Sequence, residues 1–134
     1  MGVWEGQAVA GNRLWEEYQA RLNQGEDYIP NINGVETYEH CFTRVKEAME
    51  DIVNNHDGNV LIVGHELSAQ IMLAIAKGCK DSKTFLLEYR NRPYLDNCSV
   101  TEIIVEEKKY SVVHENYSPL GFKVDLPFKD ITTY

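Results

Sequence analysis

The sequence predicts an α/β fold of three layers, in which a mostly parallel central sheet with an antiparallel edge lies between helices. Amphipathic helical patterns alternate along the chain with short apolar runs that are typical of strands. Residues 60–63 are four apolar residues in succession, a pattern typical of a strand that is buried on both faces. A chain of 134 residues, 43% of them hydrophobic, can bury one continuous core. We therefore expect one domain over residues 1–134.

Two amphipathic helices are expected in the first half of the chain. Residues 8–23 carry apolar side chains at spacings of three and four. The second helix is expected to open with a capping box of Asn33 and Glu36, whose side chains bind free amides at the helix start. It runs to about Asn55. Its inward face would consist of Tyr38, Cys41, Phe42, Val45, Met49, Ile52 and Val53.

A strand and a third helix are expected next. The strand at residues 60–63 ends at Gly64. Residues 67–77 have apolar side chains in helical period, and Gly78 is well placed to stop that helix because glycine readily adopts a left-handed conformation. The two elements together predict a helix–strand–helix core.

The remaining elements are a short helix and a hairpin. Residues 80–90 are expected to be helical, followed by a loop that ends at Pro93. Residues 99–105 and 110–114 have the composition of strands, and the polar sequence EEKK between them predicts the turn of a β-hairpin.

Charge and cysteine content narrow the function classes. The formal net charge of -8 argues against nucleic acid and anionic membranes as partners, because both repel an acidic surface. Cys41, Cys79 and Cys98 lack the spacing of a metal site and the density of a secreted disulfide scaffold, so we expect reduced, buried thiols. The sequence has no apolar run long enough to cross a membrane and no leader-like start. These features predict a cytoplasmic protein.

His65 stands where the predicted strand gives way to the third helix. Open α/β sheets bind ligands beyond the carboxyl ends of their strands, where the next helix presents free amides. An imidazole there can donate a hydrogen bond to an anion. A histidine that merely caps the helix fits the same pattern, and this stretch alone leaves both interpretations open.

His65 lies in one of four segments that together form a wider pattern. MGVWEG, GVETYEHCFTRV, VLIVGHELSAQIMLAIAKG and DNCSVTEI stand in the order and approximate spacing of motifs in the histidine phosphatase (phosphoglycerate mutase-like) superfamily. Over nearly its whole length, the chain resembles the C-terminal part of that family. The resemblance implies a phosphoglycerate mutase-like fold and phosphoryl transfer by two histidines, with no metal or organic cofactor and a phosphorylated small molecule as substrate.

The resemblance also assigns roles to residues. His65 matches the second catalytic histidine, which holds the transferring oxygens and stabilises their charge. Glu36 matches the glutamate of the family's G-E-S motif and Asn97 begins its Asn-x-Ser-Val strand, so both are candidates for substrate binding. For Glu36, capping of its own helix is the alternative. Arg44, two helical turns from Glu36, is expected to be its buried structural partner.

Two further positions carry weaker indications. Trp4 and Glu5 match the family's W-E-G motif, and we expect them to pack near the site rather than to contact substrate. Glu66 follows the second histidine, where the family more often has a small residue. It could favour the charged form of His65, or lie exposed at a helix start where the dipole favours an acid.

The chain departs from the family in the groups that start the reaction. It contains no R-H-G motif, which supplies the nucleophilic histidine, and the family's acid would fall before Met1. We therefore expect a domain that is incomplete at its N-terminus and inactive on its own. The alternative is a non-catalytic module, derived from the same fold, that binds anions or proteins. A missing strand would expose a sheet edge, so we also expect that the chain, if it is stable alone, either forms a homodimer through that edge or rearranges.

Overall fold

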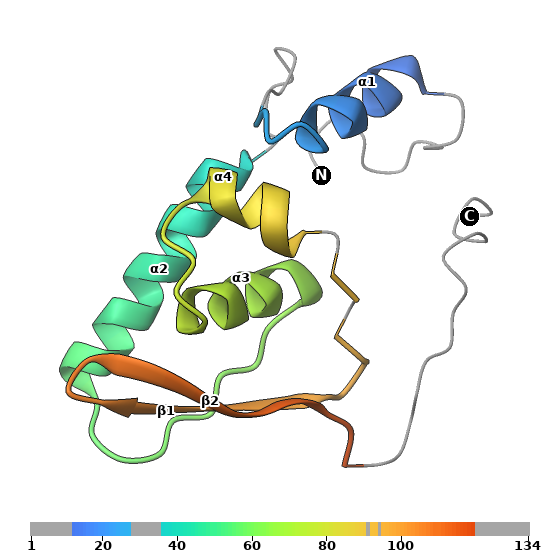
Figure 1. Ribbon diagram of the computed structural model, residues 1–134. Helices are drawn as coiled ribbons and strands as arrows, with labels where there is room; N and C mark the ends of the chain where they lie inside the picture. Colours follow the sequence, from blue (N-terminus) through green and yellow to red (C-terminus); the bar gives the residue numbers. More distant parts are fainter. Residues whose placement is uncertain (1–11, 28–35, 91, 94, 120–134) are drawn as a thin grey trace.

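The computed structural model describes residues 12–27, 36–90, 92–93 and 95–119 (Figure 1). These residues are mixed α and β, as predicted. A short helix, α4, continues directly into a π-helical turn, η2. The elements in chain order are α1 (Arg13–Leu22), α2 (Tyr38–Asn55), α3 (Glu66–Ala76), α4 (Ser82–Thr84), η2 (Phe85–Tyr89), β1 (Val100–Glu106) and β2 (Lys109–Tyr117). None of the described helices is long and apolar enough to cross a membrane.

The core lies between α2, α3 and η2, with β2 against α3 (Figure 1). Phe85 is completely buried, and its ring lies 6.2 Å from that of Tyr38 and 6.4 Å from that of Phe42. The inward face predicted for α2 is confirmed in its first three turns, whereas Ile52 and Val53 are only half-buried. The residues of α2 that are buried are Cys41, Phe42, Val45 and Met49.

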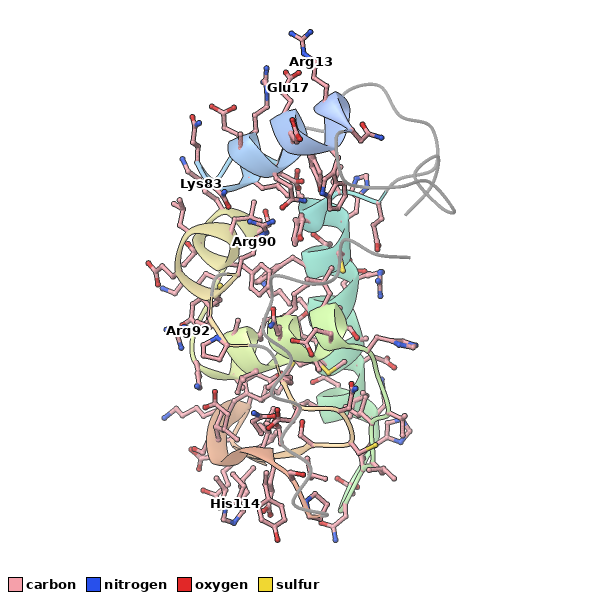
Figure 2. All side chains as sticks on the ribbon, turned by 90° about the vertical axis from the view of Figure 1, so that its right-hand side faces the viewer. Arg13, Glu17, Lys83, Arg90, Arg92 and His114 are labelled. Carbon is pink, nitrogen blue, oxygen red and sulfur yellow. The ribbon has the colours of Figure 1, made fainter. Side chains whose placement is uncertain are left out.

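A smaller cluster attaches α1 to η2. Tyr18 and Leu22 pack against Leu86. Arg90 reaches from the end of η2 toward α1, as Figure 2 shows, and donates hydrogen bonds to Asn23 Oδ1 at 2.7 Å and to the side chain of Gln19. Residues 8–11 of the first predicted helix lie outside the described residues. The part that is described begins at Arg13, one residue after its N-cap.

The capping box predicted for α2 is wrong. The helix begins at Tyr38, its N-cap is Thr37, and Glu36 precedes it in the chain. Thr37 Oγ1 accepts a hydrogen bond from the His40 amide at 3.1 Å. Asp27 accepts from the first two amides of the helix, those of Tyr38 at 3.1 Å and Glu39 at 2.6 Å. Thr37 and a carboxylate eleven residues before Tyr38 therefore cap the helix together. Asn33 lies outside the described residues.

The hairpin and the end of α3 agree with the prediction. β1 and β2 pair antiparallel, and Glu106 lies opposite Lys109. Glu107 and Lys108 form the two-residue turn with φ of 50° and 63°, the left-handed pair that suits a tight hairpin. Gly78, at φ 94°, follows α3 as its stop, and its amide donates to the Ile75 carbonyl at 2.9 Å.

The strand predicted at residues 60–63 is not formed. We call residues 59–64 the open segment. Within the described part of the chain, no hydrogen bond joins its backbone to another residue. Exposure alternates along it, with Val60 and Ile62 at 47% and 45% and Leu61 and Val63 both at 87%. Alternation of this kind is that of an extended strand with one side toward the protein. The segment has the shape of a strand, but it lacks the neighbour that makes one.

The parallel sheet is likewise not seen in the described residues, whose sheet consists of β1 and β2 alone. Both strands come from one hairpin, which can be only antiparallel. A parallel arrangement needs a strand that arrives by a crossover connection, and the open segment is the apolar run that the sequence offers for it.

Candidate functional site

His65 is the N-cap of α3, as its position in the sequence predicts. Its backbone is extended, with φ −111° and ψ 163°, and its carbonyl accepts the first hydrogen bond of the helix from Ala69 at 2.9 Å. Ser68 Oγ accepts from the His65 amide at 3.2 Å and donates to the His65 carbonyl at 2.8 Å. These bonds fix the backbone from which an exposed imidazole projects.

Glu66 is half-buried and ties α3 to the segment before β1. Its Oε1 accepts a hydrogen bond from Gln70 Nε2 at 2.7 Å and from the Leu95 amide at 3.0 Å. Neither of the roles weighed from the sequence predicted this contact, because Leu95 is 29 residues away. Its carboxylate therefore positions the chain next to the helix start.

The same segment leads to Asn97. Asn116, at φ 52° in β2, accepts from the Asp96 amide at 2.7 Å through Oδ1 and donates to Asp96 Oδ2 at 3.2 Å. Asn97 and Cys98 form an exposed turn, in which Cys98 has φ 59°. The described contacts thus run from Glu66 through Leu95 to this turn, but they include none between Asn97 and His65.

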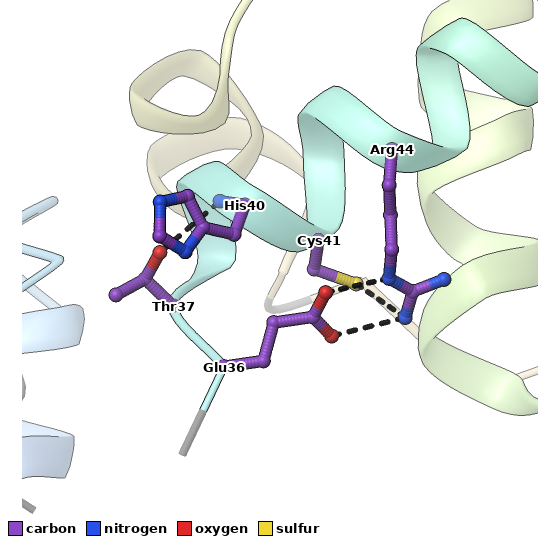
Figure 3. Close-up of polar contacts among 5 residues, drawn as sticks. All are labelled: Glu36, Thr37, His40, Cys41 and Arg44. Carbon is purple, nitrogen blue, oxygen red and sulfur yellow. Dashed lines mark hydrogen bonds and ion pairs between the residues drawn. The ribbon is translucent and has the colours of Figure 1, made fainter. Parts of the chain in front are cut away.

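Glu36 and Arg44 form a bidentate ion pair beside Cys41, shown in Figure 3. Arg44 Nε lies 2.5 Å from Glu36 Oε1, and Arg44 Nη2 lies 3.0 Å from Oε2 and 3.4 Å from Cys41 Sγ. The hydrogen bond from Arg44 lowers the pKa of Glu36, and the same bond raises the pKa of Arg44. The expected pair is therefore present, but the expected burial is wrong, because both side chains are exposed.

This pair suits a structural role better than substrate binding. Nε and Nη2 of Arg44 already donate to Glu36, and Nη2 also contacts Cys41 Sγ. The contacts among the described residues do not link either charged group to His65. Figure 3 also shows Thr37 capping His40 at the start of α2, directly after Glu36. The ion pair thus fastens the residue before the helix to its second turn.

The three cysteines are free thiols, as predicted, but only two of them are buried. Cys41 and Cys79 lie in the core, and burial raises the pKa of both thiols. Cys98 is exposed in the turn before β1, so the expectation of burial is wrong there. In the part of the chain that is described, no three His, Cys, Asp or Glu side chains are grouped to hold a metal ion.

A hollow of about 320 Å³ lies elsewhere, between α2 and the start of α4. His65 and the other predicted site residues do not line it, and Trp4 and Glu5 lie outside the described residues. Carboxylates outnumber lysines in its wall, so it does not suit a phosphate. The lining residues are Glu39, Phe42, Thr43, Lys46, Glu47, Glu50, Lys80, Asp81 and Ser82.

Some of the positioning residues had signals in the sequence. Ser68 stands three residues after His65, the spacing of a capping residue pair. Asp27 stands eleven residues before Tyr38, too far for a local capping pattern to identify the amides that it binds. Residues 60–63 carry no mark that separates a paired strand from an unpaired one.

Comparison with known proteins identifies the family. The model of the histidine phosphatase superfamily (branch 1) matches residues 1–118. Searches of curated proteins and of solved structures give no match. The matched range includes α1, α2, His65, α3, β1 and β2 and is most of the chain. The chain belongs to the histidine phosphatase superfamily.

Proposed function

We propose that this chain carries the phosphate-holding half of a histidine phosphatase site, in which His65 binds the phosphoryl group of a phosphorylated small molecule. The observation that carries the proposal is the place of His65: exposed, at the N-cap of an 11-residue helix, in a member of this superfamily. Family membership supports the chemistry, and the helix start supports the choice of residue.

His65 and α3 would act on the negative charge of the phosphoryl group. The first amides of a helix have no partner within it, and the helix dipole adds a partial positive charge there. An imidazole N–H at the same point can donate to a non-bridging phosphoryl oxygen. Donors that are already in place when charge develops stabilise the transition state without reorganisation, and this is the contribution that we assign to His65.

The reaction also needs a nucleophile and an acid. The 134 residues contain no R-H-G motif, and we propose that the complete protein takes both groups from outside these residues. There, an imidazole nitrogen would attack phosphorus and form a phosphohistidine while the acid protonates the leaving oxygen. Water, or a second acceptor in a mutase, would then take the phosphoryl group. Hydrolysis or transfer of a phosphomonoester is thus a property of the complete protein, and this chain alone is inactive.

The three-layer fold belongs to the same proposal. The open segment would become an inner strand of a mostly parallel sheet once a neighbouring strand pairs with it, and its four apolar residues support that place. Glu36 and Asn97 stay candidates for substrate binding in that form only. A cytoplasmic location is supported by the buried free thiols of Cys41 and Cys79, which suit a reducing compartment.

A protein-interaction module is the second candidate, and one observation favours it. Leu61 and Val63 are each 87% exposed, and monomeric proteins seldom leave adjacent large apolar side chains so open. A chain that performs no chemistry could use this surface to bind another protein.

Phosphate release from p-nitrophenyl phosphate tests the proposal. The 134-residue chain should give no release above a buffer blank. In a complete protein that contains both these residues and an R-H-G motif, His65→Ala should lower kcat by about 100-fold or more. His114→Ala is the matched control, because that histidine is exposed on β2. Rapid release by the 134 residues, abolished by His65→Ala, would refute the division of the site. A native protein without an R-H-G motif would favour the second candidate.

A further inference from the structure

Asp57 differs from the other aspartates of the described residues in the contacts of its carboxylate. It is exposed in the turn that joins α2 to the open segment, and its carboxylate has no hydrogen bond or ion pair with another described residue. The other described aspartates all accept hydrogen bonds through their carboxylates; they are Asp27, Asp51, Asp81 and Asp96. The Asp57 side chain is therefore free to turn toward its own backbone.

The amide that follows Asp57 is equally open, because it belongs to Gly58. This glycine has φ 81°, and a Cβ placed on it would meet no atom within 4 Å. Its amide donates no hydrogen bond to another described residue, and glycine has no side chain to shield the nitrogen. In the part of the chain that the structure describes, Asp57 is the only Asp or Asn that a glycine follows. The other such pair in the sequence, Asn33 with Gly34, lies outside the described residues.

We propose that Asp57 and Gly58 form a site of spontaneous covalent modification, at which the aspartyl linkage of the backbone isomerises to an isoaspartyl linkage. The Gly58 amide nitrogen attacks Cγ of the protonated Asp57 carboxyl and closes a five-membered imide, while the carboxyl hydroxyl and the amide proton leave as water. Water then opens the ring. Cleavage between the nitrogen and Cγ restores aspartate, whereas cleavage between the nitrogen and the original carbonyl carbon leaves the chain running through Cβ and Cγ. Mass and formal charge are unchanged overall.

The fold restrains the same reaction at other aspartates. Asp81 is the N-cap of α4, and its Oδ1 accepts a hydrogen bond from the Thr84 amide at 2.8 Å. This bond must break before the carboxyl can turn toward the Ser82 amide. Asp51 lies inside α2, where the amide that follows it takes part in the hydrogen bonds of the helix. Unfolding would remove both restraints, whereas the described contacts give Asp57 none to lose.

The product would alter the connection between α2 and the open segment. An isoaspartyl linkage adds one carbon atom to the main chain and leaves a carboxylate on the atom that was Cα. His56, which directly precedes Asp57, is still tied to the helix, because its amide donates to the Ile52 carbonyl at 3.0 Å. The helix and the core should therefore keep their structure, while the chain after Asp57 is displaced relative to α2. The inference does not depend on phosphate binding by His65.

Ageing of the 134-residue chain at physiological temperature tests the site. Electron-transfer fragmentation in a mass spectrometer distinguishes isoaspartyl from aspartyl residues and locates them in the sequence. In the folded chain, isoaspartate should form at least about fivefold faster at Asp57 than at Asp81, where the following amide is less open and a capping bond must first break. Unfolding in urea should raise the rate at Asp51 and Asp81 and leave the rate at Asp57 nearly unchanged. A rate at Asp57 that rises on unfolding as strongly as the rate at Asp81 would overturn the structural argument.

Two substitutions of Asp57 test the chemistry. Asp57→Glu keeps the carboxylate but would have to close a six-membered ring, so isomerisation at this position should fall below detection. Asp57→Asn closes the same imide with loss of ammonia, and it should form isoaspartate faster than the parent chain. Because the side chain is exposed, the far-ultraviolet circular dichroism of both variants should match that of the parent. Absence of isoaspartate at Asp57 under conditions in which Asp57→Asn converts, or equal rates at Asp57 and Asp81 in the folded chain, would overturn the proposal.

Discussion

The core and the open segment are built from the same kinds of residue and have opposite environments. Ile71, Ala74 and Phe85 are completely buried between α2, α3 and η2. Leu61 and Val63, which precede α3 directly, are 87% exposed. A helix satisfies its own backbone hydrogen bonds and needs only a surface to pack on, whereas a strand needs a neighbouring strand first. Apolar composition therefore predicts burial only where the backbone already has partners.

Loss of an apolar side chain should change the free energy of unfolding far more in the core than in the open segment. Phe85→Ala should lower the free energy of unfolding by about 3–5 kcal/mol, because it leaves a cavity at a fully buried site. Leu61→Ala should change it by less than about 0.5 kcal/mol at a concentration where the chain is monomeric. Urea denaturation followed by circular dichroism measures both. A similar loss from the two substitutions would mean that the open segment is packed in solution as tightly as the core.

A smaller effect is expected at the boundary between the two regions. Glu66→Ala should cost about 1 kcal/mol, because it removes the acceptor of the Leu95 amide. Glu66→Gln keeps a side-chain oxygen there and should lose less. Hydrogen exchange at the Leu95 amide is the specific measurement, and it should become faster in the alanine variant. An unchanged exchange rate would show that the segment before β1 is positioned by Asn116 and not by Glu66.

The smallest effect concerns an exposed contact of α2. The pKa of Glu36 is lowered below its ordinary value of 4.5 by its bond to Arg44, so the ion pair stabilises the folded chain above that pH. The contribution should disappear as the pH falls through the lowered pKa. Since both side chains are exposed, it should be no more than about 0.5 kcal/mol at neutral pH.

A double-mutant cycle measures this contribution. Glu36→Gln and Arg44→Gln, alone and together, should show a coupling free energy at pH 7 that decreases in urea titrations as the pH falls below 4.5 and through the lowered pKa of Glu36. Coupling that persists at low pH would mean that packing beside Cys41, rather than charge, holds the two residues together.

The sequence predicted the elements whose signals are local. The end of α2 at Asn55, the stop at Gly78 and the hairpin turn at Glu107 all follow from residues within a few positions. The place of His65 is local in the same way, because a strand-like run, a glycine and a helix adjoin it.

The failures involve partners that lie far away in the chain. Asp27 caps α2 from eleven residues away, and Glu66 binds an amide 29 residues away, so neither contact can be read from spacing. Residues 60–63 have the composition of a buried strand, but composition does not say whether a neighbouring strand is present. The wrong prediction of a strand at residues 60–63 has the same cause, because a strand depends on a neighbouring strand from elsewhere in the chain.

If His65 holds phosphate in the 134 residues alone, inorganic phosphate should bind at the start of α3. The most direct measurement is a titration of the 134-residue chain with inorganic phosphate, followed by the amide and imidazole nuclear magnetic resonance signals of His65, Glu66 and Leu67. We predict saturable shifts at these residues that His65→Ala weakens at least about tenfold and that His114→Ala leaves unchanged. Shifts that are absent from the start of α3, or that survive His65→Ala, would contradict the claim.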